Sequence, residues 1–441
     1  MIDEAFFALA IAVGCYIATF VAKDYLFIGD IGLVAQDRAL QLQADTTAST
    51  LVPPFVVIDI DDTGFARLGY PPVTPRAFIA KLLEVVGRGQ PRLIVVDIDL
   101  AWRTDGEDAG ALRRQLELLT KRTGTFTLFV RQPFHGGDGS GRATTLRATA
   151  YDDIVDTAAN MLWIEAVAIA DGDGITRRYL PGQLLERGDA IVPLPNVQLA
   201  ACVALQGARQ FDELKRVTAP RRVSGPSSRA NGPLTPDFAC HGKIWPLTGD
   251  ASESSRIVFK MRWSLPDGSA RPQIALPGRE TQVEEVEILN AVDFAAAAPS
   301  IDEAQARQLF DGRIVIIGSS AEDVGDIYRT SIGTMPGMLV TANGMRSAVE
   351  AGPILANNGY LLGLFVTVGM TAITFLFWLG VRELPAYRVP IFKYSAFVLS
   401  TILWLLIASW AFASGYVIEF VFPQYLATGY LLFATSWQEA L

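Results

Sequence analysis

Three short runs of β-branched and other apolar residues, each ending in polar residues, predict a central β-sheet. They lie at 55–60 (FVVIDI), 92–100 (RLIVVDIDL) and 313–318 (RIVIIG). Uninterrupted apolar runs of this length are typical of strands buried on both faces of a parallel sheet. Residues 75–87 have apolar positions at helical spacing and begin with Pro, so the first two strands and this helix form a βαβ unit.

Further segments extend the same alternation of strands and helices. We expect helices at 27–44, 110–124, 196–205 and 301–310. We expect strands at 125–130, within 156–170 and at 256–262, and a hairpin with its turn at 171–174. Residues 283–294 should contain a strand and a short helix, and residues 338–350 a strand running into a helix. Residues 207–255 are rich in Pro, Gly, Ser and Arg, which predicts a flexible surface insertion. The fold class is therefore α/β, with a mixed, largely parallel sheet and flanking helices.

Four long apolar segments predict transmembrane helices. They are residues 5–22, 360–380, 394–413 and 420–437, and none contains a charged residue. Each is long enough to cross a bilayer, and 50% hydrophobic against 19% charged residues is unusual for a soluble protein. The first segment lacks a basic residue before it, which favours an uncleaved anchor over a removed signal peptide. The region between the first two apolar segments is the domain 23–353.

The short loops between these segments predict the orientation. Residues 381–393 contain Arg382, Arg388 and Lys393, whereas 414–419 contain no Lys or Arg. Basic loops stay in the cytoplasm, so the domain 23–353 lies outside it. There, Cys202 and Cys240 can form a disulfide, because disulfides persist in oxidising compartments; a single possible pair leaves free thiols as the alternative. The net charge of −9 argues against nucleic acid as a partner.

Polar residues follow the predicted strands, where the carboxyl ends of a parallel sheet form a binding edge. The candidate ligand-binding residues are Asp59, Asp61, Asp62, Asp97, Ser319, Asp323 and Asp326. Asp59, Asp61, Asp97 and Asp99 lie at the ends of strands that we expect to be adjacent, and together they have the oxygen ligands of a divalent-cation site. Alternatively, these carboxylates cap helices and bond loop amides. The pattern Asp59-Ile60-Asp61 also resembles haloacid-dehalogenase-type phosphatases, with Asp59 as nucleophile and Asp61 as acid–base.

Four motifs follow one another along the domain. The first joins Asp59-Ile60-Asp61-Asp62-Thr63-Gly64 to Leu68-Gly69, Pro75-Arg76 and Val96-Asp97-Ile98; the others are DGDGITRR at 171–178, GRIVIIGS at 312–319 with Asp326, and Met335-Pro336-Gly337 with Ala342-Asn343. Together with one apolar segment before the domain and three after it, they resemble type-two CHASE domains, the extracytoplasmic sensory domains of bacterial receptors. The 207–255 insertion and Thr63, where the family has Ser, depart from its pattern.

The resemblance implies a sensor of the bacterial inner membrane that is not an enzyme and needs no cofactor. It implies an unknown extracytoplasmic ligand, a homodimer, and a signal passed through the transmembrane helices to a cytoplasmic effector. Family members usually continue into a cyclase or kinase, so we expect an effector that is separate or removed, since this chain stops at Leu441. Two alternatives remain, a dehalogenase-type membrane phosphatase and a scaffold subunit whose Gly363, Gly369 and Gly380 allow close helix packing.

Overall fold

The computed structural model describes most of the chain between residues 52 and 353. The gaps are 103–105, 136–142, 181, 189, 223–237, 241–242, 249–254, 265–270 and 274–285, and residues 37, 402 and 406 are also described. The chain divides into two compact units, Ala44–Pro353 and a second made of Met1–Gln43 with Ile354–Leu441. The four predicted spans and the 27–44 helix lie outside the described residues, apart from those three positions. No helix in the described part is long and apolar enough to cross a bilayer.

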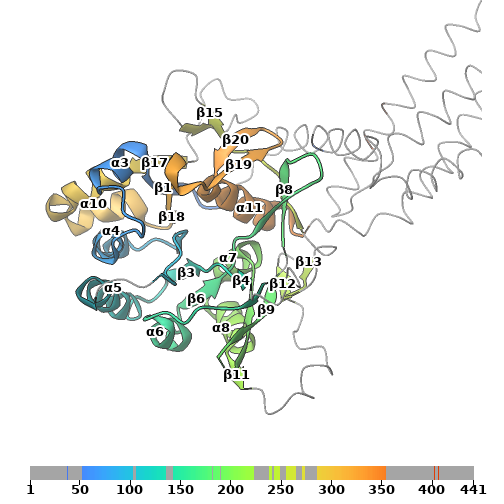
Figure 1. The fold of residues 1–441 in the computed structure, drawn as a ribbon, viewed down its shortest axis with the longest axis horizontal. Helices are drawn as coiled ribbons and strands as arrows, with labels where there is room; N and C mark the ends of the chain where they lie inside the picture. Colours follow the sequence, from blue (N-terminus) through green and yellow to red (C-terminus); the bar gives the residue numbers. More distant parts are fainter. Residues whose placement is uncertain are drawn as a thin grey trace, which may run out of the picture. The chain divides into compact units, whose positions relative to one another are not determined.

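A six-stranded parallel sheet forms the centre of the unit Ala44–Pro353 (Figure 1). Its order is β17 (Val286–Asn290), β1 (Phe55–Ile60), β18 (Ile314–Ser319), β2 (Leu93–Val96), β3 (Phe126–Val130) and β6 (Met161–Ile164). All neighbouring pairs are parallel. The prediction of a largely parallel sheet is confirmed, but β1 and β2 are not adjacent. β18, which comes more than 200 residues later in the chain, lies between them.

Helices cover both faces of this sheet, and the alternation of side chains decides which face each strand residue meets. Phe55 and Val57 point into one core, and Val56 and Ile58 into the other. The first core contains residues of α7 (Val197–Gln206), α8 (Ala208–Thr218) and α11 (Gly337–Ala351). The second contains residues of α4 (Arg76–Arg88), α5 (Gly106–Leu119), α6 (Asp152–Thr157), α9 (Ala291–Ala297) and α10 (Glu303–Phe310), with α3 (Asp62–Arg67) and η3 (Ala298–Ser300) beside them. Burial on both sides explains why the strands are apolar throughout.

Short strands form smaller sheets around the central one. One sheet has the order β14 (Ser255–Arg256), β8 (Thr176–Tyr179), β19 (Ile327–Thr330) and β20 (Gly333–Pro336), with β7 (Ala168–Ala170) paired to β8. A second contains β11 (Arg221–Arg222), β10 (Ala190–Leu194), β9 (Gln183–Arg187), β5 (Ala143–Thr145) and β4 (Phe134–His135). Two pairs complete the set, β12 (Phe238–Cys240) with β13 (Lys243–Trp245) and β15 (Arg262–Ser264) with β16 (Arg271–Gln273). The antiparallel pairing of β7 with β8 confirms the predicted hairpin.

The predicted strand at 256–262 is wrong for its middle part. Only Ser255–Arg256 and Arg262–Ser264 are strands, because the backbone between them bonds to side chains of α11. The amides of Lys260 and Met261 donate to Asn343 Oδ1 at 2.8 and 2.9 Å, and the Val258 amide donates to Ser347 Oγ at 3.1 Å. The Ile257 amide still donates to the Arg177 carbonyl of β8 at 2.7 Å, but the rest of this segment is held by a helix instead of by a neighbouring strand.

Two other predictions differ from the structure. Residues 338–350 were expected to include a strand, but α11 is helical throughout from Gly337 to Ala351. The sequence predicts a flexible surface insertion at 207–255, whose Pro-, Gly- and Ser-rich centre at 223–237 lies outside the described residues. The described parts of the range contribute to the core. Phe211 and Trp245 are 0% and 1% exposed. Because the range as a whole has few apolar residues, its composition does not predict these few buried side chains.

Candidate functional site

The candidate residues lie at the carboxyl edge of the central sheet, but they form two separate groups. Asp59 is the second-last residue of β1, Ser319 is the last residue of β18, and Asp97 directly follows β2. Asp326 precedes β19, and Asp323 is an exposed residue of the 3-10 helix η4 (Glu322–Val324). Because β18 separates β1 from β2, Asp59 and Asp97 have different neighbours.

The first group joins the loops after β1 and β18. Asp59 is 5% exposed, and its two carboxylate oxygens accept from the Ser320 amide at 2.9 Å and the Ser320 hydroxyl at 2.7 Å. Burial raises the pKa of Asp59 to about 6, although both bonds from Ser320 lower it. A carboxylate with both oxygens occupied inside the protein has a structural role, and it gives no support to the phosphatase alternative.

The neighbouring polar residues also make local bonds. Asp61 caps α3 by accepting from the Gly64 amide at 2.6 Å, and Asp62 accepts from the Glu322 amide at 2.8 Å. The Ser319 hydroxyl donates to the Ile60 carbonyl at 2.7 Å. These bonds match the interpretation in which the carboxylates cap helices and satisfy loop amides.

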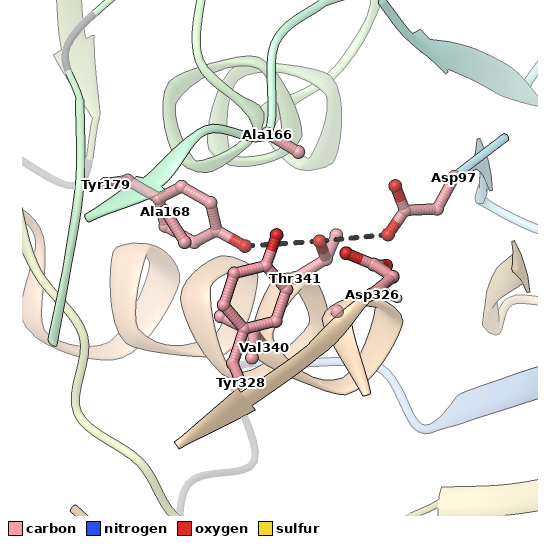
Figure 2. Close-up of a pocket in the computed structure, with 9 residues that line it drawn as sticks. Asp97, Ala166, Ala168, Tyr179, Asp326, Tyr328, Val340 and Thr341 are labelled. Atoms are coloured by element: carbon pink, nitrogen blue, oxygen red, sulfur yellow. Dashed lines mark hydrogen bonds between the residues drawn. The ribbon is translucent and has the colours of Figure 1, made fainter. Parts of the chain in front are cut away.

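The second group surrounds a small polar cavity, which Figure 2 shows with the side chains that line it. The carboxyl groups of Asp97 and Asp326 point into the same space, beside the hydroxyls of Tyr179, Tyr328 and Thr341. The cavity offers about 20 Å³ to water-sized groups, enough for a water molecule but too little for a larger ligand. Ala166, Ala168, Gly337 and Val340 complete its wall.

A chain of hydrogen bonds crosses this cavity. The Thr341 hydroxyl donates to Asp97 Oδ2 at 3.1 Å, and the Tyr179 hydroxyl lies 3.1 Å from Thr341 Oγ1. Since Thr341 has a single proton and gives it to Asp97, Tyr179 donates to Thr341. These hydrogen bonds thus run from β8 through α11 to the end of β2. They connect the sheet of β14, β8, β19 and β20, here called the accessory sheet, to the central one.

The electrostatics of the cavity disfavour negative charge. Burial raises the pKa of Asp97 to about 7, and the carboxylate of Asp326 adds to the rise, whereas the bond from Thr341 lowers it. Burial also raises the pKa of Asp326, against a hydrogen bond with Tyr328 that lowers it. Burial further raises the pKa of the Tyr179 and Tyr328 hydroxyls, so both stay neutral. Two carboxyls in one small space make full ionisation costly.

Two glycines of the sequence motifs make this close packing possible. A Cβ at Gly337 would lie 2.1 Å from Asp326 Oδ2, far inside contact distance, so any side chain there would displace the carboxyl. A Cβ at Gly318 would lie 2.9 Å from the Cβ of Met338 and 3.5 Å from that of Asp97. Both positions therefore need glycine for close approach rather than for backbone freedom.

The motif at 171–178 supports the cavity from outside. Arg177 is 2% exposed and pairs with Asp173 at 2.8 Å and Asp171 at 3.2 Å, while Arg178 pairs with Asp171 at 2.5 Å. These ion pairs close the β7–β8 turn directly before Tyr179. The motif is thus a structural network that positions a cavity residue, in keeping with the cost of leaving a buried charge unpaired.

The structure does not assemble the predicted cation site. The Asp99 carboxylate accepts from the Ala101 amide at 2.9 Å. Burial raises the pKa of Asp99, and the charges of Arg131, Arg76 and Arg147 lower it. Asp97 instead faces Asp326. Within the described ranges, no group of three or more His, Cys, Asp or Glu residues is placed to hold a metal ion. Sequence reasoning missed Tyr179, Tyr328 and Thr341. Tyr179 directly follows a motif, but nothing in the order of residues shows which hydroxyls face a cavity.

Cys202 of α7 and Cys240 of β12 form a disulfide, with their Cα atoms 6.2 Å apart. Both residues are fully buried, so the bond lies within the first core rather than at the surface. It connects the range 207–255 to the helix that precedes it.

The fold and the cavity define a parallel α/β domain with a pair of interacting carboxyls at the carboxyl edge of its sheet. The described residues at this edge form no metal-binding cluster. Residues 9–382 match the sequence model of the CHASE2 domain, and the chain belongs to this family, which is one of extracellular, non-catalytic sensory domains. Comparison with curated proteins gives no match, and neither does comparison with solved structures.

Proposed function

We propose that this protein is a membrane-anchored sensory module whose domain lies outside the cytoplasm and passes its signal through transmembrane helices. The observation that carries the proposal is the extent of the family match. It begins at residue 9, inside the apolar segment 5–22, and ends at residue 382, just after the apolar segment 360–380. The matched range therefore includes most of the apolar segment before the domain and the whole of the first one after it.

Along the sequence, the helix α11 is the last element of the domain before the second apolar segment. Its first turns contribute Gly337, Val340 and Thr341 to the cavity wall, and it ends at Ala351, close to the boundary of the unit at Pro353. Its last turn is tied to the domain by the ion pair of Glu350 with Lys260 at 2.7 Å, and Arg346 of the same helix also pairs with Glu350 at 2.8 Å. A rigid helix moves as one body, so a displacement of its start at the cavity also moves its end.

The proposed partners are the membrane, a second copy of this chain and a cytoplasmic effector. A second copy would give each set of transmembrane helices a surface to move against. A signal of this kind requires that the ligand bind two conformations of the domain with different affinities. Motion of α11 is the conformational difference that we propose.

The proposal is tested by finding on which side of the membrane two matched cysteine variants lie in intact spheroplasts. Thr123→Cys places a thiol in the exposed turn between α5 and β3, and Ala386→Cys places one in the basic loop 381–393. We expect a membrane-impermeant maleimide to label Thr123→Cys at once and Ala386→Cys only after permeabilisation. The wild type, whose Cys202 and Cys240 are bonded and buried, supplies the background. Labelling of Ala386→Cys alone in intact spheroplasts would overturn the proposal.

A further inference from the structure

We propose that the signal acting on this domain is the proton, which binds to the Asp97–Asp326 pair and thereby controls the contact of β19, β20 and α11 with the central sheet. This inference rests on the proposed function, because protonation acts as a signal only if the domain is sensory. The pair itself is defined by geometry alone. One carboxyl belongs to the central sheet and the other to the accessory sheet, and both open onto one cavity.

The groups that face the pair explain why it holds a proton. Of the described residues lining the cavity, none is a lysine, arginine or histidine, and Tyr179 and Tyr328 are the other titratable groups. A negative charge on both carboxyls would have no cation in the cavity to balance it. Two neighbouring carboxylates in such a site retain one proton between them, and their apparent pKa values belong to the pair. Burial and Asp326 together raise the pKa of Asp97 to about 7.

The two carboxyls differ in their surroundings, which decides where the proton resides. Asp326 packs against Gly337, the first residue of α11, and its carbonyl accepts from the Gly337 amide at 2.8 Å. The start of a helix favours negative charge, so Asp326 ionises first. Asp97 then holds the proton, and its Oδ2 remains the end of the hydrogen-bond chain from Tyr179 and Thr341.

Loss of the second proton has a direct structural consequence. With both groups ionised, Asp97 on the β2 side and Asp326 on the β19 side repel each other across the cavity. Backbone bonds and strand pairs hold Asp326 to the start of α11 and to β20, so this repulsion acts on the helix that leads to Pro353. The proton on Asp97 prevents this repulsion and keeps the elements together, and its loss loosens them. The resting and signalling states thus differ by protonation.

The test is an infrared pH titration of the carboxylic acid band, using the purified full-length chain in lipid. We expect a wild-type transition near pH 7 that Asp97→Asn removes. Asp326→Asn deletes the repelling charge and should move the transition downward by about one pH unit. Thr341→Val deletes the bond that favours the ionised form and should move it upward. Asp323→Asn, at an exposed site close by in sequence, should leave it unchanged.

Hydrogen exchange in the same samples measures the mechanical consequence. After correction for the intrinsic pH dependence of exchange, β19, β20 and the start of α11 should lose protection above about pH 7 in the wild type and not in Asp97→Asn. The opposite shifts of Asp326→Asn and Thr341→Val keep the test informative if Asp97→Asn does not fold. Three results would overturn the proposal: a transition insensitive to both variants, one that moves with Mg²⁺ concentration at constant ionic strength, or unchanged exchange. None of these would alter the sidedness result, so a failure here is distinguishable from failure of the proposed function.

Discussion

At the scale of single residues, carboxylates that look equivalent in the sequence have different roles because their neighbours differ. Asp59 and Asp61 accept hydrogen bonds from groups close to the ends of β1 and β18. Asp97 instead faces a second carboxyl, that of Asp326. The polar ends of the strands were predictable as candidate ligand-binding residues, since an apolar strand running into Asp is visible in the chain. Which carboxyl meets which partner was not.

The buried carboxyl of Asp59 should make stability depend on pH. Its folded pKa of about 6 lies above the ordinary value of 3.8, so between these values the folded chain binds more protons than the unfolded chain. The free energy of unfolding therefore falls as the pH rises from about 4 to about 6, and the full cost is present above that range. We expect Asp59→Asn, which cannot ionise, to reduce this slope in denaturant unfolding of the purified chain.

The matched control is Asp323→Asn, which changes an exposed carboxyl and should keep the wild-type slope. Asn at position 59 retains an oxygen for the Ser320 amide and offers a donor to the Ser320 hydroxyl, so the variant is expected to fold. An Asp59→Asn protein with an unchanged slope would show that this carboxyl does not titrate differently in the two states.

At the scale of elements, propensity and pattern predicted most helices and strands, and the errors have physical causes. The apolar and β-branched start of α11 resembles a strand, yet Pro336 and Gly337 begin a helix that packs against α7. Conversely, residues 257–261 resemble a strand, but three of their backbone amides, at positions 258, 260 and 261, bond to the side chains of Asn343 and Ser347. In both cases tertiary contacts override a local preference.

The first turn of α11 should not tolerate a side chain at Gly337. Gly337→Ala would place a Cβ 2.1 Å from Asp326 Oδ2, so we expect a loss of roughly 1–3 kcal/mol in stability, as is usual for overpacking. Gly106→Ala is the matched control, because Gly106 is the first residue of α5 and a Cβ there meets nothing within 4 Å. Thermal unfolding should show a lower midpoint for Gly337→Ala alone. Equal midpoints for the two variants would contradict the packing described here.

At the scale of the whole molecule, strand order decides the site. The insertion of β18 between β1 and β2 moves Asp59 away from Asp97 and places Gly318 beside Asp97 and Met338. No local pattern specifies this order, because all three strands have the same apolar character. The range 207–255 shows a similar effect, since its few buried residues join the core through β12, β13 and α8.

The disulfide should be a measurable part of the stability of the domain. Cys202 and Cys240 are 38 residues apart in sequence, and closing a loop of that length is worth roughly 4 kcal/mol in the chain-entropy account. We expect a reductant to lower the unfolding midpoint of the wild type but not that of the Cys202→Ala, Cys240→Ala double variant. Cys15→Ala should respond to reductant as the wild type does. A wild type unaffected by full reduction would contradict this account.

The sequence alone determined the class of this protein, its family motifs and the polar edge of its sheet. These properties follow from the order of apolar and polar residues, which fixes the strand and helix periods and the positions where strands end. Tertiary structure decided the pairing of Asp97 with Asp326, the hydroxyls of Tyr179, Tyr328 and Thr341 around them, and the structural roles of Asp59, Asp61 and Asp62. The physical reason is that burial, charge repulsion and hydrogen bonding depend on neighbours in space, and strand order brings together residues that are far apart in the chain.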